Sequence, residues 1–188
     1  MNYKTKKHKG FTLVEAMVAI SILSLAVTGP LIIAQKGLGS AIYARDQITA
    51  FYLAQEAVEY IRNVRDSNRI SGVEWLSQFS VCKENDSVSG SEKCQIDSQY
   101  SDFTNENAIL ACPSEACPVL SLNTVNNIYG YPRIPLNNWI STIFTRTITI
   151  DDRTKPNQEV MISVSISWKT KLFEPLRVFT IKEYIFNF

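Results

Sequence analysis

The sequence predicts an α+β protein in which a long amino-terminal helix packs on a carboxyl-terminal antiparallel sheet. Three observations lead to this prediction: an apolar run over residues 11–33, a stripe of apolar residues at helical spacing after it, and alternating apolar and polar residues in the last third. The 188 residues suffice for one ordinary domain and an appendage. We divide the chain into a leader at 1–10, a membrane-spanning helix at 11–35, the amphipathic half of that helix at 36–66, a loop-rich cysteine-containing region at 67–142, and an antiparallel β-meander at 143–188.

The charge of the chain is nearly balanced but unevenly placed. Lys+Arg 19 and Asp+Glu 18 give a formal net charge of +1, and Lys4, Lys6, Lys7 and Lys9 fall in the first ten residues, where no acid occurs. No basic stripe recurs downstream, which disfavours a protein that binds nucleic acid over its whole surface. The single histidine, His8, has no Cys, Asp or Glu at ligand spacing, so histidine-based catalysis and a histidine-ligated metal are nearly excluded.

Residues 11–33 form an apolar run with one charge, Glu15. A helix of this length covers about 35 Å, enough to cross the roughly 30 Å hydrocarbon core of a lipid bilayer. The leader lysines precede the run, and Lys36 and Arg45 after it are sparser. The positive-inside bias therefore places residues 1–10 in the cytoplasm and the chain after Lys36 outside.

A secretory signal peptide is the alternative interpretation of this segment, with Ser24-Leu25-Ala26 as a small-x-small cleavage site. Two features oppose it. The apolar run continues past Ala26 to Ile33, and Glu15 lies inside the run, where a carboxylate is costly unless it has a function.

The segment Lys9-Gly10-Phe11-Thr12-Leu13-Val14-Glu15 resembles the cleavage and methylation motif of type IV prepilins and of the pseudopilins of type II secretion and competence systems. The resemblance implies that prepilin peptidase cuts between Gly10 and Phe11 and methylates the new amino terminus of Phe11. It further implies a pilin-like fold and assembly with other pilin or pseudopilin subunits on an inner-membrane platform. Glu15, about 6 Å along a helix that starts at Phe11, would then pair with the amino terminus of an adjacent subunit and set the axial register. The alternative role for Glu15 is a tolerated first-turn charge.

The helix should bend near Gly29 and Pro30, because Pro30 lacks an N–H and crowds the preceding turn. By the resemblance this bend is a break that lets the helix unwind locally in a filament, and an ordinary transmembrane proline is an equal alternative. Beyond Lys36 the helix is expected to run to about Arg65, with an apolar stripe of Ile48, Phe51, Ala54, Val58, Ile61 and Val64. On its solvated side we expect the ion pairs Glu59–Arg62 and Arg62–Asp66.

All four cysteines lie in the Ser- and Asn-rich region 67–142. An exported chain meets an oxidising environment, which favours two disulfides over free thiols. We choose sequential pairing, Cys82 with Cys94 and Cys112 with Cys117, among three connectivities because short loops close most easily. A zinc site is the alternative, opposed by the absence of a Cys-x-x-Cys pair and of a nearby histidine.

Three strands are predicted in the last third. Residues 143–150 and 160–168 alternate with a period of two, and residues 177–186 form a third strand in which Glu183 interrupts the apolar face and suggests an edge or a bulge. Residues 151–157 have the composition of a turn, so Asp151 and Asp152 are assigned to that turn and not to a cation site. The meander should bury its apolar face on the amphipathic half of the helix.

These features predict a structural subunit, a minor pilin or pseudopilin of a filament anchored in the cytoplasmic membrane with its head outside. No cysteine follows Cys117 and no acidic calcium loop lies near the carboxyl end, which departs from major pilins and major pseudopilins. The alternatives are a filament-tip binding module, with residues 67–142 as an adhesin or DNA receptor, and a secreted disulfide-bonded domain. We find no catalytic motif and expect neither an enzyme nor a cofactor.

Overall fold

The structure, a computed structural model, describes residues 10–83, 93–100, 107–113, 116–132, 134, 136–155, 157–170 and 175–187. The basic leader with His8 lies outside these residues. The chain forms two compact units, Met1–Asp46 and Gln47–Phe188, and we call the second unit the head. Helix α1 (Leu13–Ile70) is the first element, and its residues belong to both units.

The first unit contains the apolar part of α1. The helix is continuous through Gly29 and Pro30, so no break in helical structure occurs there. The bend expected at these residues stays a prediction.

The carboxyl end of α1 lies at Ile70, five residues beyond the end expected at Arg65. Gly72 follows in a left-handed conformation with φ of 70°. The N–H of Val73 donates to the C=O of Asn68 at 2.9 Å, and the N–H of Gly72 donates to the C=O of Arg69 at 3.2 Å. This pair of bonds is a Schellman motif, which satisfies carbonyls of the last turn and depends on a residue that tolerates positive φ. The helix therefore ends where Gly72 permits the turn.

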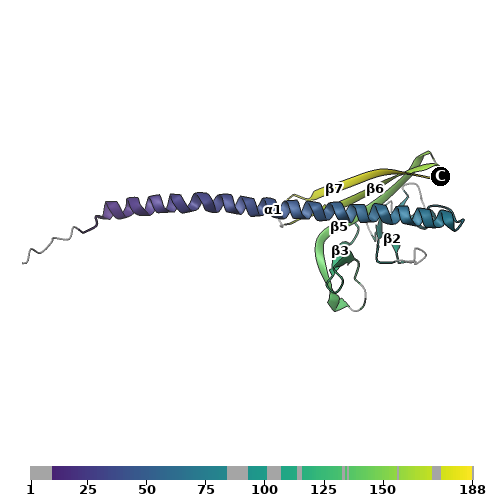
Figure 1. Ribbon diagram of the computed structural model, residues 1–188, viewed down its shortest axis with the longest axis horizontal. Helices are drawn as coiled ribbons and strands as arrows, with labels where there is room; N and C mark the ends of the chain where they lie inside the picture. The colour runs from purple at the N-terminus through teal and green to yellow at the C-terminus, as the bar shows by residue number, and fades with distance from the viewer. Residues whose placement is uncertain are drawn as a thin grey trace, which may run out of the picture. The chain divides into compact units, whose positions relative to one another are not determined.

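Seven strands of the head form one antiparallel sheet (Figure 1). They are β1 (Cys94–Ile96), β2 (Ile109–Ala111), β3 (Val119–Asn123), β4 (Ile128–Gly130), β5 (Trp139–Lys155), β6 (Glu159–Trp168) and β7 (Arg177–Phe186). Two short 3₁₀ helices, η1 (Ser77–Cys82) and η2 (Leu136–Asn138), complete the described elements. The β5–β6–β7 meander is the predicted one. The expectation of a three-stranded sheet was wrong in extent, because the region 67–142 adds β1 to β4 to the same sheet.

Strand β5 pairs with neighbouring strands along both of its edges. One of its edges pairs with β6 from Phe144 to Lys155, and the other pairs first with β3 and then, at Ile148, with Cys94 of β1. Short strands from the cysteine-containing region thereby share one long strand with the meander. They were missed because strands of three to five residues are too short to show a clear period of two.

The turn between β5 and β6 is shorter than predicted. Strand β5 continues to Lys155, so the assignment of Asp151 and Asp152 to a turn was wrong. Asp151 pairs with Met161 in the ladder, and a register shift between Asp151 and Lys155 marks an irregularity in the strand. The carboxylate of Asp152 lies 3.5 Å from the Nζ of Lys83.

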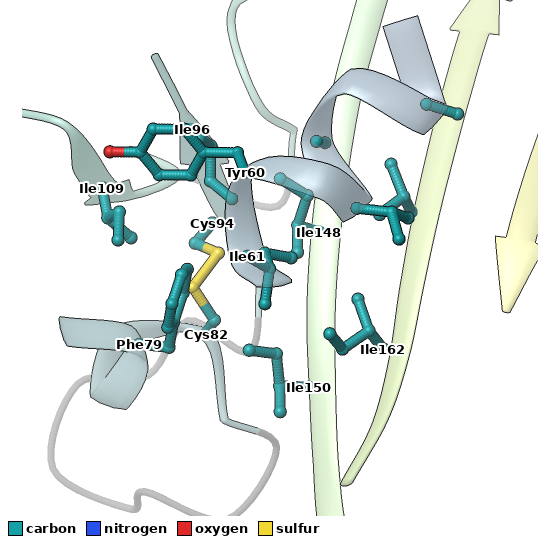
Figure 2. Close-up of a cluster of buried hydrophobic side chains, with 14 of the residues drawn as sticks. Tyr60, Ile61, Phe79, Cys82, Cys94, Ile96, Ile109, Ile148, Ile150 and Ile162 are labelled. Atoms are coloured by element: carbon teal, nitrogen blue, oxygen red, sulfur yellow. A yellow bond between two sulfur atoms is a disulfide. The ribbon is translucent and has the colours of Figure 1, made fainter. Parts of the chain in front are cut away.

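The core lies between α1 and the sheet, as Figure 2 shows around Ile61 and Ile148. The predicted stripe was partly wrong, because Ile48 is 57% exposed and Phe51 is 39% exposed. Ala54 of the predicted stripe is fully buried, and so are Ala50 and Ala57, which the predicted stripe did not include. Small side chains let the helix backbone approach the sheet closely, which apolar periodicity alone does not reveal. The sheet contributes alternate residues of β6, from Val160 to Trp168.

Candidate processing and assembly site

The residues of the predicted cleavage motif lie at the start of α1. Gly10, Phe11 and Thr12 precede the helix and are exposed. A peptide bond between Gly10 and Phe11 is thus outside the helical hydrogen-bond pattern, with no side chain on Gly10 to obstruct a protease. The sequence placed the helix start at Phe11; the helix begins two residues later, at Leu13.

Thr12 is the amino-terminal cap of α1. Its hydroxyl accepts a hydrogen bond from the N–H of Glu15 at 3.2 Å, and its C=O accepts one from the N–H of Ala16 at 3.1 Å. Thr-x-x-Glu is the sequence of a capping box, which explains why the chain becomes helical directly after Thr12. Glu15 therefore occupies the first turn, where the helix dipole favours its negative charge.

The helix that follows Glu15 exposes its apolar side chains. Leu13, Val14 and Leu25 are among the most exposed of them, at 77%, 68% and 77%. Helix α1 contains an 18-residue window of mean hydropathy 2.3 with none of it buried, so by length and composition it could cross a membrane. An exposed apolar surface of this size is unstable in water and is typical of a segment that binds lipid or other helices.

Residues 5–29 match a protein family described as the prokaryotic N-terminal methylation motif. The chain carries a prokaryotic N-terminal methylation motif. Type IV prepilins and pseudopilins carry such a motif, so the resemblance inferred from Gly10 to Glu15 is confirmed. Neither the curated proteins nor the solved structures compared with the chain gave a match.

The methylation motif is followed by a head with two disulfides. Cys82 is joined to Cys94 and Cys112 to Cys117, the sequential pairing described above. The first disulfide is fully buried and ties η1 to β1 within the core (Figure 2). The second lies beside it, with the Sγ of Cys117 3.7 Å from the C=O of Cys94. All four cysteines are disulfide-bonded, which fits the expectation of two disulfides.

A buried arginine in the head was not expected from the sequence. Arg146 of β5 is fully buried, and its guanidinium donates to the C=O of Leu53 at 3.1 Å and to the C=O of Ile96 at 2.6 Å. It also pairs with the carboxylate of Glu56 at 3.1 Å, and Glu56 accepts a further hydrogen bond from Ser98. Arg146 thus connects α1, β1 and β5. Arg146 alternates in step with the apolar residues Phe144 and Ile148 along the strand. This position was the sequence signal that its side chain faces the core.

Tyr131 lies close to this arginine. Burial raises the pKa of the Tyr131 hydroxyl to about 12, and the charge of Asp97 acts in the same direction, while Arg146 acts against both. The hydroxyl is therefore protonated at neutral pH and can act as a donor.

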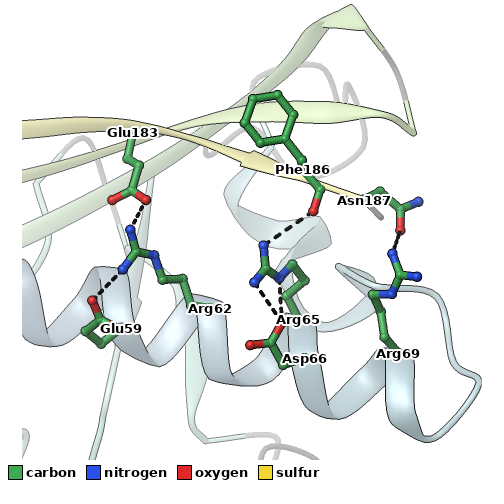
Figure 3. Close-up of polar contacts among 8 residues, drawn as sticks. All are labelled: Glu59, Arg62, Arg65, Asp66, Arg69, Glu183, Phe186 and Asn187. Atoms are coloured by element: carbon green, nitrogen blue, oxygen red, sulfur yellow. Dashed lines mark hydrogen bonds and ion pairs between the residues drawn. The ribbon is translucent and has the colours of Figure 1, made fainter.

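Three arginines of α1 contact the carboxyl-terminal end of the chain, as Figure 3 shows. Arg62 pairs with Glu183 of β7 and with Glu59, which confirms the expected Glu59–Arg62 pair. The hydrogen bond to Glu183 raises the pKa of the Arg62 guanidinium above its usual value. The expected Arg62–Asp66 pair was wrong, because Asp66 pairs with Arg65 at 2.7 Å.

The other two contacts lie further along the helix. Arg65 donates to the C=O of Phe186 at 3.4 Å, and Arg69 donates to the side chain of Asn187 at 3.1 Å. The ion pairs of Arg62 were expected on the solvated side of the helix. Instead Arg62, Arg65 and Arg69 connect the helix to β7 and to Asn187 directly after it.

Proposed function

We propose that the chain is a structural subunit, a minor pilin or pseudopilin, of a filament of the type IV pilus, type II secretion or competence class. The observation that carries the proposal is the methylation motif at residues 5–29, followed directly by an exposed apolar helix. A motif that directs cleavage before this helix leaves the helix on the mature chain as a membrane anchor. The mature chain then still has the apolar helix through which it would pack into a filament.

The proposed order of events begins with insertion of the precursor in the cytoplasmic membrane, leader inside and head outside. Prepilin peptidase cleaves between Gly10 and Phe11 and methylates the amine of Phe11. The apolar helix then leaves the bilayer by packing against helices of other subunits, so that its exposed side chains exchange lipid for protein contacts. In the exported head, the disulfides are stable because the compartment is oxidising.

Glu15 gives the proposed assembly step its specificity. Its first-turn position presents a carboxylate within an otherwise apolar surface. In surroundings of low dielectric constant, a carboxylate and an ammonium attract strongly, and either charge alone is costly. The proposed partner is the methylated amine of the adjacent subunit, which fixes how far one helix is displaced along the next.

Replacement of Glu15 by Leu tests this function. We expect normal membrane insertion and cleavage, because apolar length governs insertion and the replacement removes the only charge of the span. Recovery of the cleaved chain in sheared filaments should fall by about tenfold or more, since the unpaired amine costs about one to a few kcal/mol. The measurement is an immunoblot of sheared filaments against the membrane fraction.

Two variants control this experiment. Glu15→Asp keeps the charge and should retain most of the assembly, whereas Ser24→Ala changes another helix residue and should assemble like the wild type. Equal recovery of Glu15→Leu and wild type would refute the register role. Release of a wild-type head into the medium, without its apolar helix, would support the secreted-domain alternative.

A further inference from the structure

Strand β7 forms an edge of the sheet. In the described part of the chain it pairs with β6 alone, through ten consecutive residue pairs without a shift of register. In an antiparallel ladder, each residue turns both its N–H and its C=O to one side, and the side alternates along the strand. Every second residue of β7 therefore turns its backbone groups away from β6.

Two hydrogen bonds identify these residues. The N–H of Asn187 donates to the C=O of Gln158 at 2.8 Å, and this pair continues the β6–β7 register, so odd-numbered residues of β7 turn toward β6. The C=O of Phe186, an even-numbered residue, accepts from Arg65 of α1 and not from β6. Both observations show that the even-numbered residues of β7 turn their backbone N–H and C=O groups away from β6.

The residues concerned are Val178, Thr180, Lys182 and Tyr184, and we call their outward backbone groups the open edge. Among the described residues no strand or loop backbone engages the open edge. Val178 is 59% exposed and Tyr184 is 52% exposed. The open edge covers about 20 Å, a length typical of a whole strand in a globular protein.

Charges protect many natural edge strands from pairing, typically a lysine on the edge or a charge that points inward. Strand β7 has both, in Lys182 and Glu183. Glu183 is bound by Arg62, so its charge is already compensated within the head. Lys182 belongs to the open edge and opposes an incoming strand, and an acidic residue opposite it would remove that opposition.

We propose that the open edge of β7 pairs with an extended strand of the neighbouring subunit in the filament. This rests on the proposed function, which supplies the neighbour. Donors and acceptors that recur every second residue match an extended polypeptide, because a β-strand presents its own groups with the same period. Apolar residues of that strand lie beside Val178 and Tyr184, and an acidic residue lies beside Lys182.

Amide hydrogen exchange of the full chain tests the pairing. The chain in sheared filaments is compared with the chain extracted from the membrane in detergent, with single-residue resolution over β7. We expect exchange at Val178, Thr180, Lys182 and Tyr184 to slow by about tenfold or more in filaments, since these amides become hydrogen-bonded only there. The amides of Phe179 and Ile181 serve as internal controls, because they already bond to β6 in both samples.

A pair of variants tests the same claim by assembly. Thr180→Pro removes an outward N–H and leaves the β6 ladder complete, so recovery in filaments should fall by about tenfold, whereas Thr180→Val keeps the N–H and should be recovered like the wild type. A wild-type chain that is absent from filaments would contradict the proposed function and this inference together. A chain that is present there, with the four amides exchanging as in detergent, would overturn the strand pairing alone.

Discussion

Arg146 places a buried guanidinium between α1, β1 and β5, where it bonds two backbone carbonyls and Glu56. Replacement by Met keeps much of the volume but leaves these acceptors without their donor. We expect Arg146→Met to lower the free energy of unfolding by about 2 to 3 kcal/mol, below the upper range for buried pairs because Glu56 is partly exposed. The measurement is urea unfolding of the full chain in detergent, followed by tryptophan fluorescence.

Thr147→Val is the matched control, because Thr147 is the next residue of β5 and faces away from the core. It should change the free energy of unfolding by no more than about 0.5 kcal/mol. An Arg146→Met protein as stable as the wild type would show that the arginine network does not stabilise the head.

Tyr131 should make the stability of the head depend on alkaline pH. Burial raises its pKa to about 12 from the ordinary value of 10.0. The stabilising contribution is therefore complete below pH 10 and decreases as pH rises toward 12, because the unfolded state ionises first. We expect a loss of about 1 kcal/mol near pH 11. Tyr131→Phe should show a smaller loss over this range in the same unfolding experiment, and an identical loss would contradict the assignment.

At the scale of the elements, Gly72 determines where α1 ends. A Cβ at this position meets nothing within 4 Å, so the cost of replacement is conformational. We expect Gly72→Ala to lower the free energy of unfolding by roughly 1 kcal/mol, because alanine is strained at φ of 70°. Gly72→Asn should cost less, since asparagine tolerates the left-handed region. Urea unfolding of the three proteins gives the order, and equal stability of alanine and glycine would contradict the cap.

Elements with a long period were predictable from the sequence, and short ones were not. The alternation at 143–150, 160–168 and 177–186 predicted β5, β6 and β7 because each has one apolar face over many residues. Strands β1, β2 and β4 have three residues each and depend on pairing with neighbouring strands. The predicted end of α1 at about Arg65 was five residues too early. Gly72 after Ser71 is a typical carboxyl-terminal cap and indicates the later end.

At the scale of the whole molecule, the motif at Gly10 to Glu15 was predictable because it is local. The same six consecutive residues contain both the cap of α1 and the proposed site of processing. The contacts of Arg146 and the contact of Arg62 with Glu183 were not predictable, since they join residues 50 or more positions apart in the sequence. Such contacts depend on how the sheet and helix meet, and a single sequence carries no local signal for them.

The central claim is that the mature chain begins at Phe11 and retains the apolar helix. Intact mass spectrometry of the chain purified from membranes, with fragmentation of its amino terminus, tests this claim most directly. We expect loss of residues 1–10 and one added methyl group on the amine of Phe11. A mature chain that begins after Ala26, or one that retains Gly10, would contradict it.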